Sequence, residues 1–288
     1  MEYVKLNNGV EMPIFGFGVY QIPKEETKEC VLNAIKVGYR LIDTAQSYFN
    51  ESEVGDAIQE CGVPREELFI TTKVWIDNYG YDKCRDSVLK SLEKLKTDYF
   101  DLVLLHQPFS DYYGAYRALE DLYEEDKIKA IGVSNFYPDR LADMCLFGRK
   151  VIPAVNQVET NPFNQQVKAQ ENMEKYGVHI EAWAPFGEGK SGMFENVTLK
   201  KIGEKYGKSV AQVILRWLIQ RGVIVVCKST HIERMEQNFD VFDFELSKED
   251  MEEIRKLDSN DSLFFNHQDS NMVEWFDKMI EERRSKMD

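Results

Sequence analysis

Two charged side chains lie in or directly after short apolar runs of this sequence, where a buried core would not favour them. Lys73 follows the run at residues 68–72, and Asp43 lies near the end of the run at residues 39–44. A buried ammonium without a partner loses much of its hydration energy, so we expect Asp43 to be its counter-charge. Taken alone, such an ion pair is equally compatible with a structural role that fixes the register of two strands.

Tyr48 and His106 would give this ion pair a chemistry. Tyr48 lies five residues after Asp43, and His106 ends the apolar run at residues 100–106. A tyrosine hydroxyl has a pKa of about 10 in water, and an adjacent lysine ammonium lowers that pKa by favouring the phenolate. An imidazole can orient a bound carbonyl oxygen, although a histidine such as His106, taken alone, is more often a core or rim residue. Together the four residues predict a site that protonates an oxygen atom while another group attacks the carbon.

Eight apolar runs alternate with segments of helical periodicity along the chain. The runs are predicted to be strands at residues 15–20, 39–44, 68–74, 100–106, 128–134, 154–158, 180–184 and 223–228. Helices are predicted at residues 25–37, 52–60, 82–95, 113–125, 139–147, 166–176 and 209–221. Continuously apolar strands that alternate with helices are typical of a parallel sheet covered by helices. Eight such units in 288 residues predict an α/β fold, a closed (β/α)8 TIM barrel with its reactive groups at the C-terminal strand ends.

An open, doubly wound sheet is the alternative fold, and for a dinucleotide it would carry the motif GxGxxG after its first strand. Gln21 occupies the position of the third glycine after Gly16 and Gly18, so the motif is incomplete. We interpret the two glycines as positions of close backbone approach at the mouth of a barrel.

Segments outside the eight units are predicted to complete the barrel. Asn8-Gly9 between apolar flanks predicts a β-hairpin over residues 4–12, which we expect to close the barrel floor. Residues 248–257 and 271–284 predict added C-terminal helices, and the loops at 186–196 and 258–271 are expected to shape the pocket. No linker divides the chain, so we expect one domain over residues 1–288.

The overall charge excludes several classes of partner. Lys and Arg number 36 against 50 Asp and Glu, which gives a formal net charge of −14. A field of this sign repels nucleic acid and anionic membranes, so we expect neither as a partner. The five cysteines form no CxxC pair, which favours reduced thiols and no metal site. Without a secretory signal or a membrane-spanning apolar run, the sequence predicts a cytoplasmic protein, which we expect to be a monomer or a weak homo-oligomer.

The motifs at the predicted strand ends, taken together, resemble those of the aldo-keto reductases. The matching segments are DTAQSY (43–48), KVW (73–75), LLHQP (104–108), IGVSNF (131–136), NQVE (156–159) and AWAPFG (182–187), followed by Lys228, Ser229, Arg234 and Asn238. The resemblance runs from the hairpin to about residue 270 in the same order along the chain.

The resemblance implies an NADPH-dependent enzyme that reduces aldehydes and ketones. In that family the residues that match Asp43, Tyr48, Lys73 and His106 form a catalytic tetrad, and a hydride from NADPH attacks the carbonyl carbon. The residues implied to hold the nicotinamide are Ser134, Asn135, Gln157 and Trp183, of which Trp183 stacks on the ring. The residues implied to contact the 2′-phosphate and adenine are Lys228, Ser229, Arg234 and Asn238.

A capping-box pattern supports a phosphate site after the last predicted strand. Thr230 and Glu233 match this pattern, which predicts a helix N-terminus there with Thr230 as its cap. The free N–H groups of such a terminus, joined by Lys228 and Arg234, can bind a phosphate in an otherwise acidic protein.

The substrate pocket is expected to be lined by Tyr20, Trp75, His106 and Gln107. Many family members have tryptophan where this chain has Gln107, and the replacement favours hydroxylated or sugar-like carbonyls, as in the similar bacterial diketogluconate reductases. Two alternative functions remain from the residues: a Schiff-base lyase or aldolase that uses Lys73 or Lys228 as the amine nucleophile, and a non-catalytic NADPH-binding regulatory subunit.

Overall fold

Parallel strands close into an eight-stranded barrel in the computed structural model, which describes residues 1–147 and 150–284. In their order around the barrel, the strands are β3 (Phe15–Gly18), β4 (Leu41–Asp43), β5 (Phe69–Val74), β6 (Leu102–Leu105), β7 (Ile131–Ser134), β8 (Val155–Glu159), β9 (His179–Trp183) and β10 (Ile224–Cys227). The barrel is closed because β10 pairs with β3, where Val226 lies opposite Gly16. The predicted (β/α)8 barrel is confirmed, and the open-sheet alternative is wrong. Each predicted run overlaps one strand, although β8 ends one residue after its run and β9 begins one residue before.

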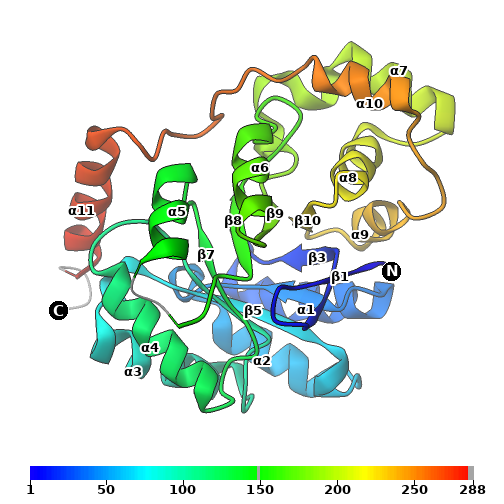
Figure 1. The fold of residues 1–288 in the computed structure, drawn as a ribbon. Coiled ribbons are helices and arrows are strands. Elements are labelled where there is room, and N and C mark those ends of the chain that lie inside the picture. Colours follow the sequence, from blue (N-terminus) through cyan, green and yellow to red (C-terminus); the bar gives the residue numbers. More distant parts are fainter. Residues whose placement is uncertain (148–149, 285–288) are drawn as a thin grey trace.

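Helices surround the barrel (Figure 1). They are α1 (Lys24–Val37), α2 (Glu51–Glu60), α3 (Tyr81–Leu95), α4 (Tyr112–Glu124), α5 (Pro138–Leu146), α6 (Val167–Lys175), α7 (Val197–Tyr206), α8 (Val210–Gln220), α9 (Ile232–Phe239), α10 (Lys248–Arg255) and α11 (Ser270–Arg284). The predicted helices are confirmed, but α7 was not predicted. Two residues in the sequence could have indicated the ends of α7. Asn196 caps its N-terminus by accepting the Leu199 N–H, and Gly207 adopts a left-handed conformation after its last turn.

An apolar cluster fills the N-terminal half of the barrel interior. The predicted hairpin is confirmed and consists of β1 (Tyr3–Lys5) and β2 (Glu11–Pro13). Leu6 and Met12 of this hairpin join the interior cluster with Leu41, Phe69 and Ile224, which are the first residues of β4, β5 and β10. The hairpin therefore closes the floor of the barrel, and the polar side chains of the strands lie at the opposite end.

The two glycines of β3 differ in what surrounds them. A Cβ atom at Gly16 would lie 2.4 Å from Cγ of Leu41, so the neighbouring strand leaves no space for a side chain. At Gly18 the nearest heavy atom would be 3.9 Å away, and this residue borders the cavity described below. The close-approach interpretation is thus confirmed for Gly16 and wrong for Gly18.

The described chain contains neither a paired cysteine nor a helix suited to a bilayer. Each of the five cysteines is free, and all but Cys61 are buried. Within residues 1–147 and 150–284, no helix is long and apolar enough to cross a membrane.

Candidate active site

A cavity of about 1170 Å³ opens at the C-terminal ends of the barrel strands. Pockets for single drug-sized ligands have volumes of about 300–1,000 Å³, so this cavity can hold a large ligand and a small one together. Fourteen of the residues predicted from the sequence line it, and they are Tyr20, Asp43, Tyr48, Trp75, His106, Gln107, Ser134, Asn135, Gln157, Trp183, Lys228, Ser229, Arg234 and Asn238. Lys73 lies beneath the cavity floor, where it is fully buried.

The Lys73 ammonium uses all three of its N–H donors inside the barrel. Its Nζ donates to Asp43 Oδ1 at 2.5 Å, to the Thr44 carbonyl oxygen at 3.2 Å and to the Tyr48 hydroxyl at 3.2 Å. Burial disfavours the charged form, but the Asp43 carboxylate outweighs this penalty and the pKa of Lys73 is raised. The predicted ion pair is therefore present, and Lys73 is a protonated hydrogen-bond donor.

A short helical turn after β4 brings Tyr48 back over Lys73. This turn, η1 (Gln46–Tyr48), is held by Gln46, whose Oε1 accepts from the Trp75 N–H at 3.0 Å and from Asn78 Nδ2 at 2.8 Å. Phe49, directly after the turn, has a left-handed φ of 59°. Gln46 is a positioning residue that was not predicted from the sequence, because its partners Trp75 and Asn78 lie in the segment after β5, about 30 residues further along the chain.

The pKa of Tyr48 departs from the sequence-based expectation. Burial of the hydroxyl raises the pKa of Tyr48 to about 12, and the Asp43 carboxylate acts in the same direction. The Lys73 ammonium lowers this pKa as expected, but only in part. The expectation of a net lowering is therefore wrong for this structure, because desolvation outweighs the ammonium. Tyr48 is a protonated phenol over the whole neutral range.

The ring of His106, which lies directly after β6, is close to the Tyr48 ring. Its ring centroid lies 5.8 Å from that of Tyr48 and 5.0 Å from that of Trp75, both in edge-on geometry. The Ser47 hydroxyl lies 3.5 Å from His106 Nδ1. Tyr48 and His106 thus place two hydrogen-bonding groups beside each other at the wall of the cavity.

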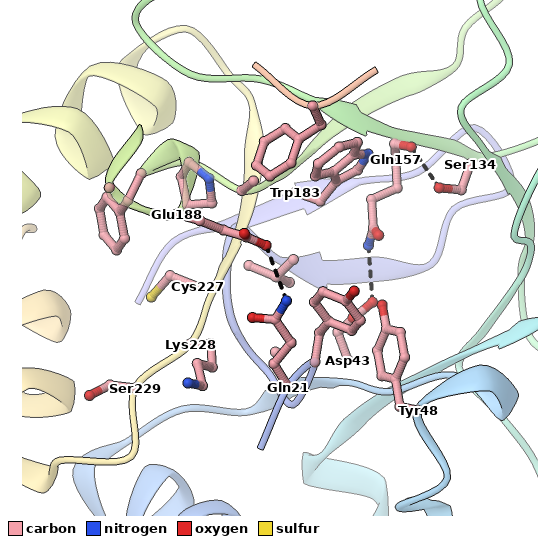
Figure 2. A pocket seen from close by; sticks show the side chains of 18 of the residues that line it. Gln21, Asp43, Tyr48, Ser134, Gln157, Trp183, Glu188, Cys227, Lys228 and Ser229 are labelled. Atoms are coloured by element: carbon pink, nitrogen blue, oxygen red, sulfur yellow. Dashed lines mark hydrogen bonds between the residues drawn. The ribbon is translucent and has the colours of Figure 1, made fainter. Parts of the chain in front are cut away.

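Hydrogen bonds link the predicted nicotinamide residues to this wall. Gln157 Nε2 donates to Asp43 Oδ2 at 3.0 Å, and the Ser134 hydroxyl donates to the Gln157 carbonyl oxygen at 2.8 Å (Figure 2). Asn135 Nδ2 donates to the His106 carbonyl oxygen at 3.1 Å, and Trp183 Nε1 donates to Asn135 Oδ1 at 3.0 Å. These bonds fix the side chains relative to Asp43 and His106.

The basic end of the cavity lies after β10. Figure 2 shows Lys228 and Ser229 on the side away from Tyr48. Lys228 and Arg234 are exposed, and neither forms an ion pair with another described residue. The predicted helix start is confirmed, but Thr230 is not its cap. His231 occupies that position, and its side chain forms no capping hydrogen bond. The Ser229 hydroxyl, two residues earlier, accepts the His231 N–H at 3.0 Å.

Another part of the cavity wall comes from the C-terminal part of the chain. The chain after α10 runs to α11 on the other side of the barrel (Figure 1). Its residues in the cavity wall are Phe264, Phe265, Trp275, Phe276 and Met279. The loop at 258–271 was predicted to shape the pocket, but the contribution of α11 was not. The apolar spacing of residues 272, 275, 276 and 279 was the signal that could have revealed it.

Hydrogen bonds hold this C-terminal segment to the strand ends. Glu159 at the end of β8 accepts from the Ser262 hydroxyl at 2.5 Å and from the Leu263 N–H at 3.0 Å. His267 Nε2 lies 3.0 Å from Gln107 Oε1. Burial lowers the pKa of His267 to about 4, so its imidazole is neutral at neutral pH. The expectation of sugar-like substrates rested on the Gln107 side chain, and the oxygen of this side chain is engaged within the protein.

The loop after β9 closes a third side of the cavity. It contains the helical segment η4 (Gly187–Glu195), and Phe186, Glu188 and Phe194 border the cavity, as predicted for residues 186–196. Gln21 Nε2 donates to Glu188 Oε1 at 3.5 Å and so links the loop after β3 to η4 (Figure 2).

The arrangement suits proton transfer and does not suit Lys73 as an amine nucleophile. A Schiff base requires a neutral lysine, whereas Lys73 is held as an ammonium by three acceptors. Within residues 1–147 and 150–284, no group of three His, Cys, Asp or Glu side chains is placed to hold a metal ion.

Comparisons with known proteins agree with this geometry. The model of the aldo/keto reductase family matches residues 14–259. The chain is 48% identical over 262 residues to glyoxal reductase of Bacillus subtilis (strain 168), which covers 90% of this chain and 94% of that protein. It is 40% identical over 263 residues to methylglyoxal reductase DkgA of Escherichia coli (strain K12), with the same coverage of 90% and 94%.

Solved structures show the same likeness. MGS-M4, an aldo-keto reductase from a Medee basin deep-sea metagenome library, superimposes with a TM-score of 0.90 at 42% identity, covering 92% of this chain and 98% of that one. A Bombyx mori aldo-keto reductase in complex with NADP has a TM-score of 0.87 at 34% identity and covers 92% of this chain and 95% of its own.

Proposed function

Since the chain belongs to the aldo/keto reductase family, we propose that it reduces small aldehydes and ketones to alcohols, with NADPH as hydride donor and Tyr48 as proton donor. The observation that carries this proposal is the set of three hydrogen bonds from buried Lys73, one of which reaches the Tyr48 hydroxyl. A purely structural ion pair would not need a tyrosine that borders the cavity.

The residues around the cavity fit NADPH. Lys228 and Arg234 supply two cations that form no ion pair within residues 1–147 and 150–284, beside the N-terminus of α9, where a phosphate is stabilised by charge and by free N–H groups. Trp183, partly exposed at the end of β9, offers an aromatic face for a nicotinamide ring, and Ser134, Asn135 and Gln157 lie around it. A related structure contains NADP. When bound, this cofactor supplies the hydride that reduces the carbonyl carbon.

The protein's own residues handle the proton. His106 and Tyr48 hydrogen-bond to the carbonyl oxygen and orient it. As the hydride reaches the carbon, Tyr48 Oη gives its proton to the oxygen, which becomes the alcohol hydroxyl, and the phenolate left behind is stabilised by the Lys73 ammonium. A proton from solvent then restores Tyr48. Alcohol oxidation follows the same steps in reverse.

Small α-oxo-aldehydes are the substrates that we propose. Two related proteins are named as glyoxal and methylglyoxal reductases. The pocket wall is largely aromatic, from Tyr20, Trp75 and Phe276, and the Gln107 oxygen is already bonded to His267. This wall offers few free polar groups for the hydroxyls of a sugar, so a sugar-like substrate has no specific support.

The direct test measures the loss of NADPH absorbance with methylglyoxal, glyoxal, an aromatic aldehyde and a ketose, with NADH in parallel. We expect turnover with the first two and a higher kcat/KM with NADPH than with NADH. No turnover across this panel would overturn the proposed activity.

A further inference from the structure

A carboxyl group that the proposed reaction does not use is sealed inside the barrel. Glu181 lies in the middle of β9 and is fully buried. Its neighbours Ile180 and Ala182 pack in the outer cluster between strands and helices, so the alternation of a strand directs Glu181 into the barrel. Across the sheet it lies opposite Gln157 of β8 and Ile224 of β10.

Glu181 differs from the other buried glutamates in its hydrogen bonding. Glu51 accepts from the Thr72 hydroxyl at 2.9 Å, Glu120 from the Val151 N–H at 2.8 Å, and Glu159 from the Leu263 N–H at 3.0 Å. Neither carboxyl oxygen of Glu181 has a hydrogen-bond partner within the part of the chain that the structure describes. The Gln157 amide, which lies opposite Glu181 and donates to Asp43 at 3.0 Å, therefore gives a negative charge on Glu181 only partial support.

The charges inside the barrel do not balance if Glu181 is ionised. Lys73 is the ammonium of this cluster, and its three donors are used by Asp43, Thr44 and Tyr48. One ammonium balances one carboxylate, and a second buried carboxylate is costly, so Glu181 keeps a proton at neutral pH. Burial raises the pKa of Glu181 to about 8; the Asp43 carboxylate acts in the same direction, and the Lys73 ammonium and the Gln157 amide oppose it.

We propose that Glu181 is a positioning residue that sets the acid strength of Tyr48 by gaining or losing one proton within the barrel. When Glu181 is neutral, the Lys73 ammonium is opposed by Asp43 alone. When Glu181 ionises, a second negative charge disfavours the Tyr48 phenolate, so Tyr48 keeps its proton at alkaline pH. The inference rests on the proposed role of Tyr48 as the proton donor.

The groups that face Glu181 define this coupling. The titratable ones are Asp43 on β4 and Lys73 on β5, and Lys73 is bonded to Tyr48. Gln157 on β8 is uncharged and bridges to Asp43, and Ile224 on β10 is apolar. Glu181 thus acts on Tyr48 through Asp43 and Lys73, without contact with substrate.

The first measurement follows the stability of the apoprotein of the wild type and of Glu181→Gln from pH 5 to pH 9. The folded protein keeps the Glu181 proton between about 4.3, the pKa of an unfolded glutamate, and about 8, so wild-type stability falls as the pH rises through this window. The Tm of Glu181→Gln minus that of the wild type should therefore increase from pH 5 to pH 8 and then level off. A constant difference would overturn the inference, since Glu181 would then not titrate.

The second measurement is kcat/KM for alcohol oxidation with NADP⁺, in which Tyr48 acts as the base. The ratio of Glu181→Gln to wild type should be near one at pH 6 and rise about tenfold by pH 9, since a change of about one in the pKa of Tyr48 changes the phenolate population tenfold. A flat ratio would overturn the coupling to Tyr48.

Two further variants distinguish a failure of the proposed Glu181 role from a failure of the proposed Tyr48 role. Thr71→Val removes a buried hydroxyl that has no hydrogen-bond partner among the described residues and lies opposite Asp43, so it tests repacking of the barrel interior without a change of charge. Its ratio to wild type should not vary with pH, and a rise like that of Glu181→Gln would overturn the inference. A Tyr48→Phe variant with full activity would overturn the proton-donor role itself, whereas an inactive Tyr48→Phe with a flat Glu181→Gln ratio would overturn only the role of Glu181.

Discussion

The Lys73 ammonium donates a hydrogen bond to the Tyr48 hydroxyl at 3.2 Å from a position fully closed to solvent. The bond stabilises the phenolate more than the phenol, so its strength is greatest when Tyr48 has given up its proton. Because Tyr48 begins with a pKa of about 12, the donor is fully protonated before the reaction and its conjugate base has a partner in place.

Tyr48→Phe should abolish turnover because it removes the proton donor. General acid catalysis contributes about 10²–10⁴-fold, so kcat should fall by at least 100-fold. NADPH affinity, measured by fluorescence titration, should change by less than about twofold, because the cofactor residues remain. Tyr3→Phe, on exposed β1 at the barrel floor, is the matched control. A Tyr48→Phe variant that turned over at the wild-type rate would contradict the assigned role.

Lys73→Met should destabilise the fold, because it leaves the Asp43 carboxylate buried without its partner. Removal of one member of a buried ion pair costs about 3–5 kcal/mol, measurable by urea unfolding. Adding Asp43→Asn should recover most of this loss without restoring activity. Lys96→Met, which breaks an exposed pair with Asp56, should cost less than about 1 kcal/mol. If Lys73→Met and Lys96→Met lowered the free energy of unfolding by the same amount, burial of the Asp43–Lys73 pair would not increase the cost of losing its lysine.

The fold was predictable because its signals are local, and much of the site followed from it. Apolar runs and helical periodicity marked each strand of the barrel, and the position of Asp43 and Lys73 at strand ends singled them out. Glu181 carries the same signal, a charge within an apolar strand, but it lies two residues before the end of β9 and was not predicted as a site residue.

Other features depend on distance and burial that no local pattern contains. The pKa of Tyr48 is governed by desolvation, which exists only once the barrel is closed around it. The Gln107–His267 contact joins residues 160 positions apart. At the start of α9, the capping-box pattern could not show whether the Ser229 or the Thr230 hydroxyl accepts a backbone N–H. In the structure Ser229 accepts the His231 N–H.

Lys228→Ala and Arg234→Ala should each raise the KM for NADPH by about tenfold or more, since a hydrogen bond to a charged group contributes about 1.5–3 kcal/mol. The KM for NADH, which lacks the 2′-phosphate, should change little. Lys248→Ala, at an exposed lysine outside the cavity, is the control. Equal losses with both cofactors would contradict the assignment of these cations to the 2′-phosphate.

Phe276→Ala should loosen α11 from the pocket wall. Phe276 is 4% exposed and packs near Trp75 and Phe109, with ring centroids 6.1 and 5.4 Å away. The KM for an aromatic aldehyde should rise several-fold, whereas that for methylglyoxal should change less, because a small substrate bound beside Tyr48 does not require this wall. A rise in KM by the same factor for both substrates would indicate a general loss of structure, which a lower Tm of the variant would also reveal.

His267 should make the C-terminal part of the cavity wall, formed by the segment after α10 and by α11, sensitive to acid. Its folded-state pKa of about 4 lies below the value of about 6.5 for an unfolded histidine, so the unfolded chain binds the extra proton first. Stability is therefore complete above about pH 6.5 and is lost as the pH falls towards 4, by at most roughly 3 kcal/mol. We expect Trp275 fluorescence and the KM for an aromatic aldehyde to change over this window as the segment opens. His267→Gln, which keeps a donor for Gln107 Oε1 but does not titrate, should remove the dependence. If the variant and the wild type showed the same acid dependence, His267 would not be the group that opens the wall.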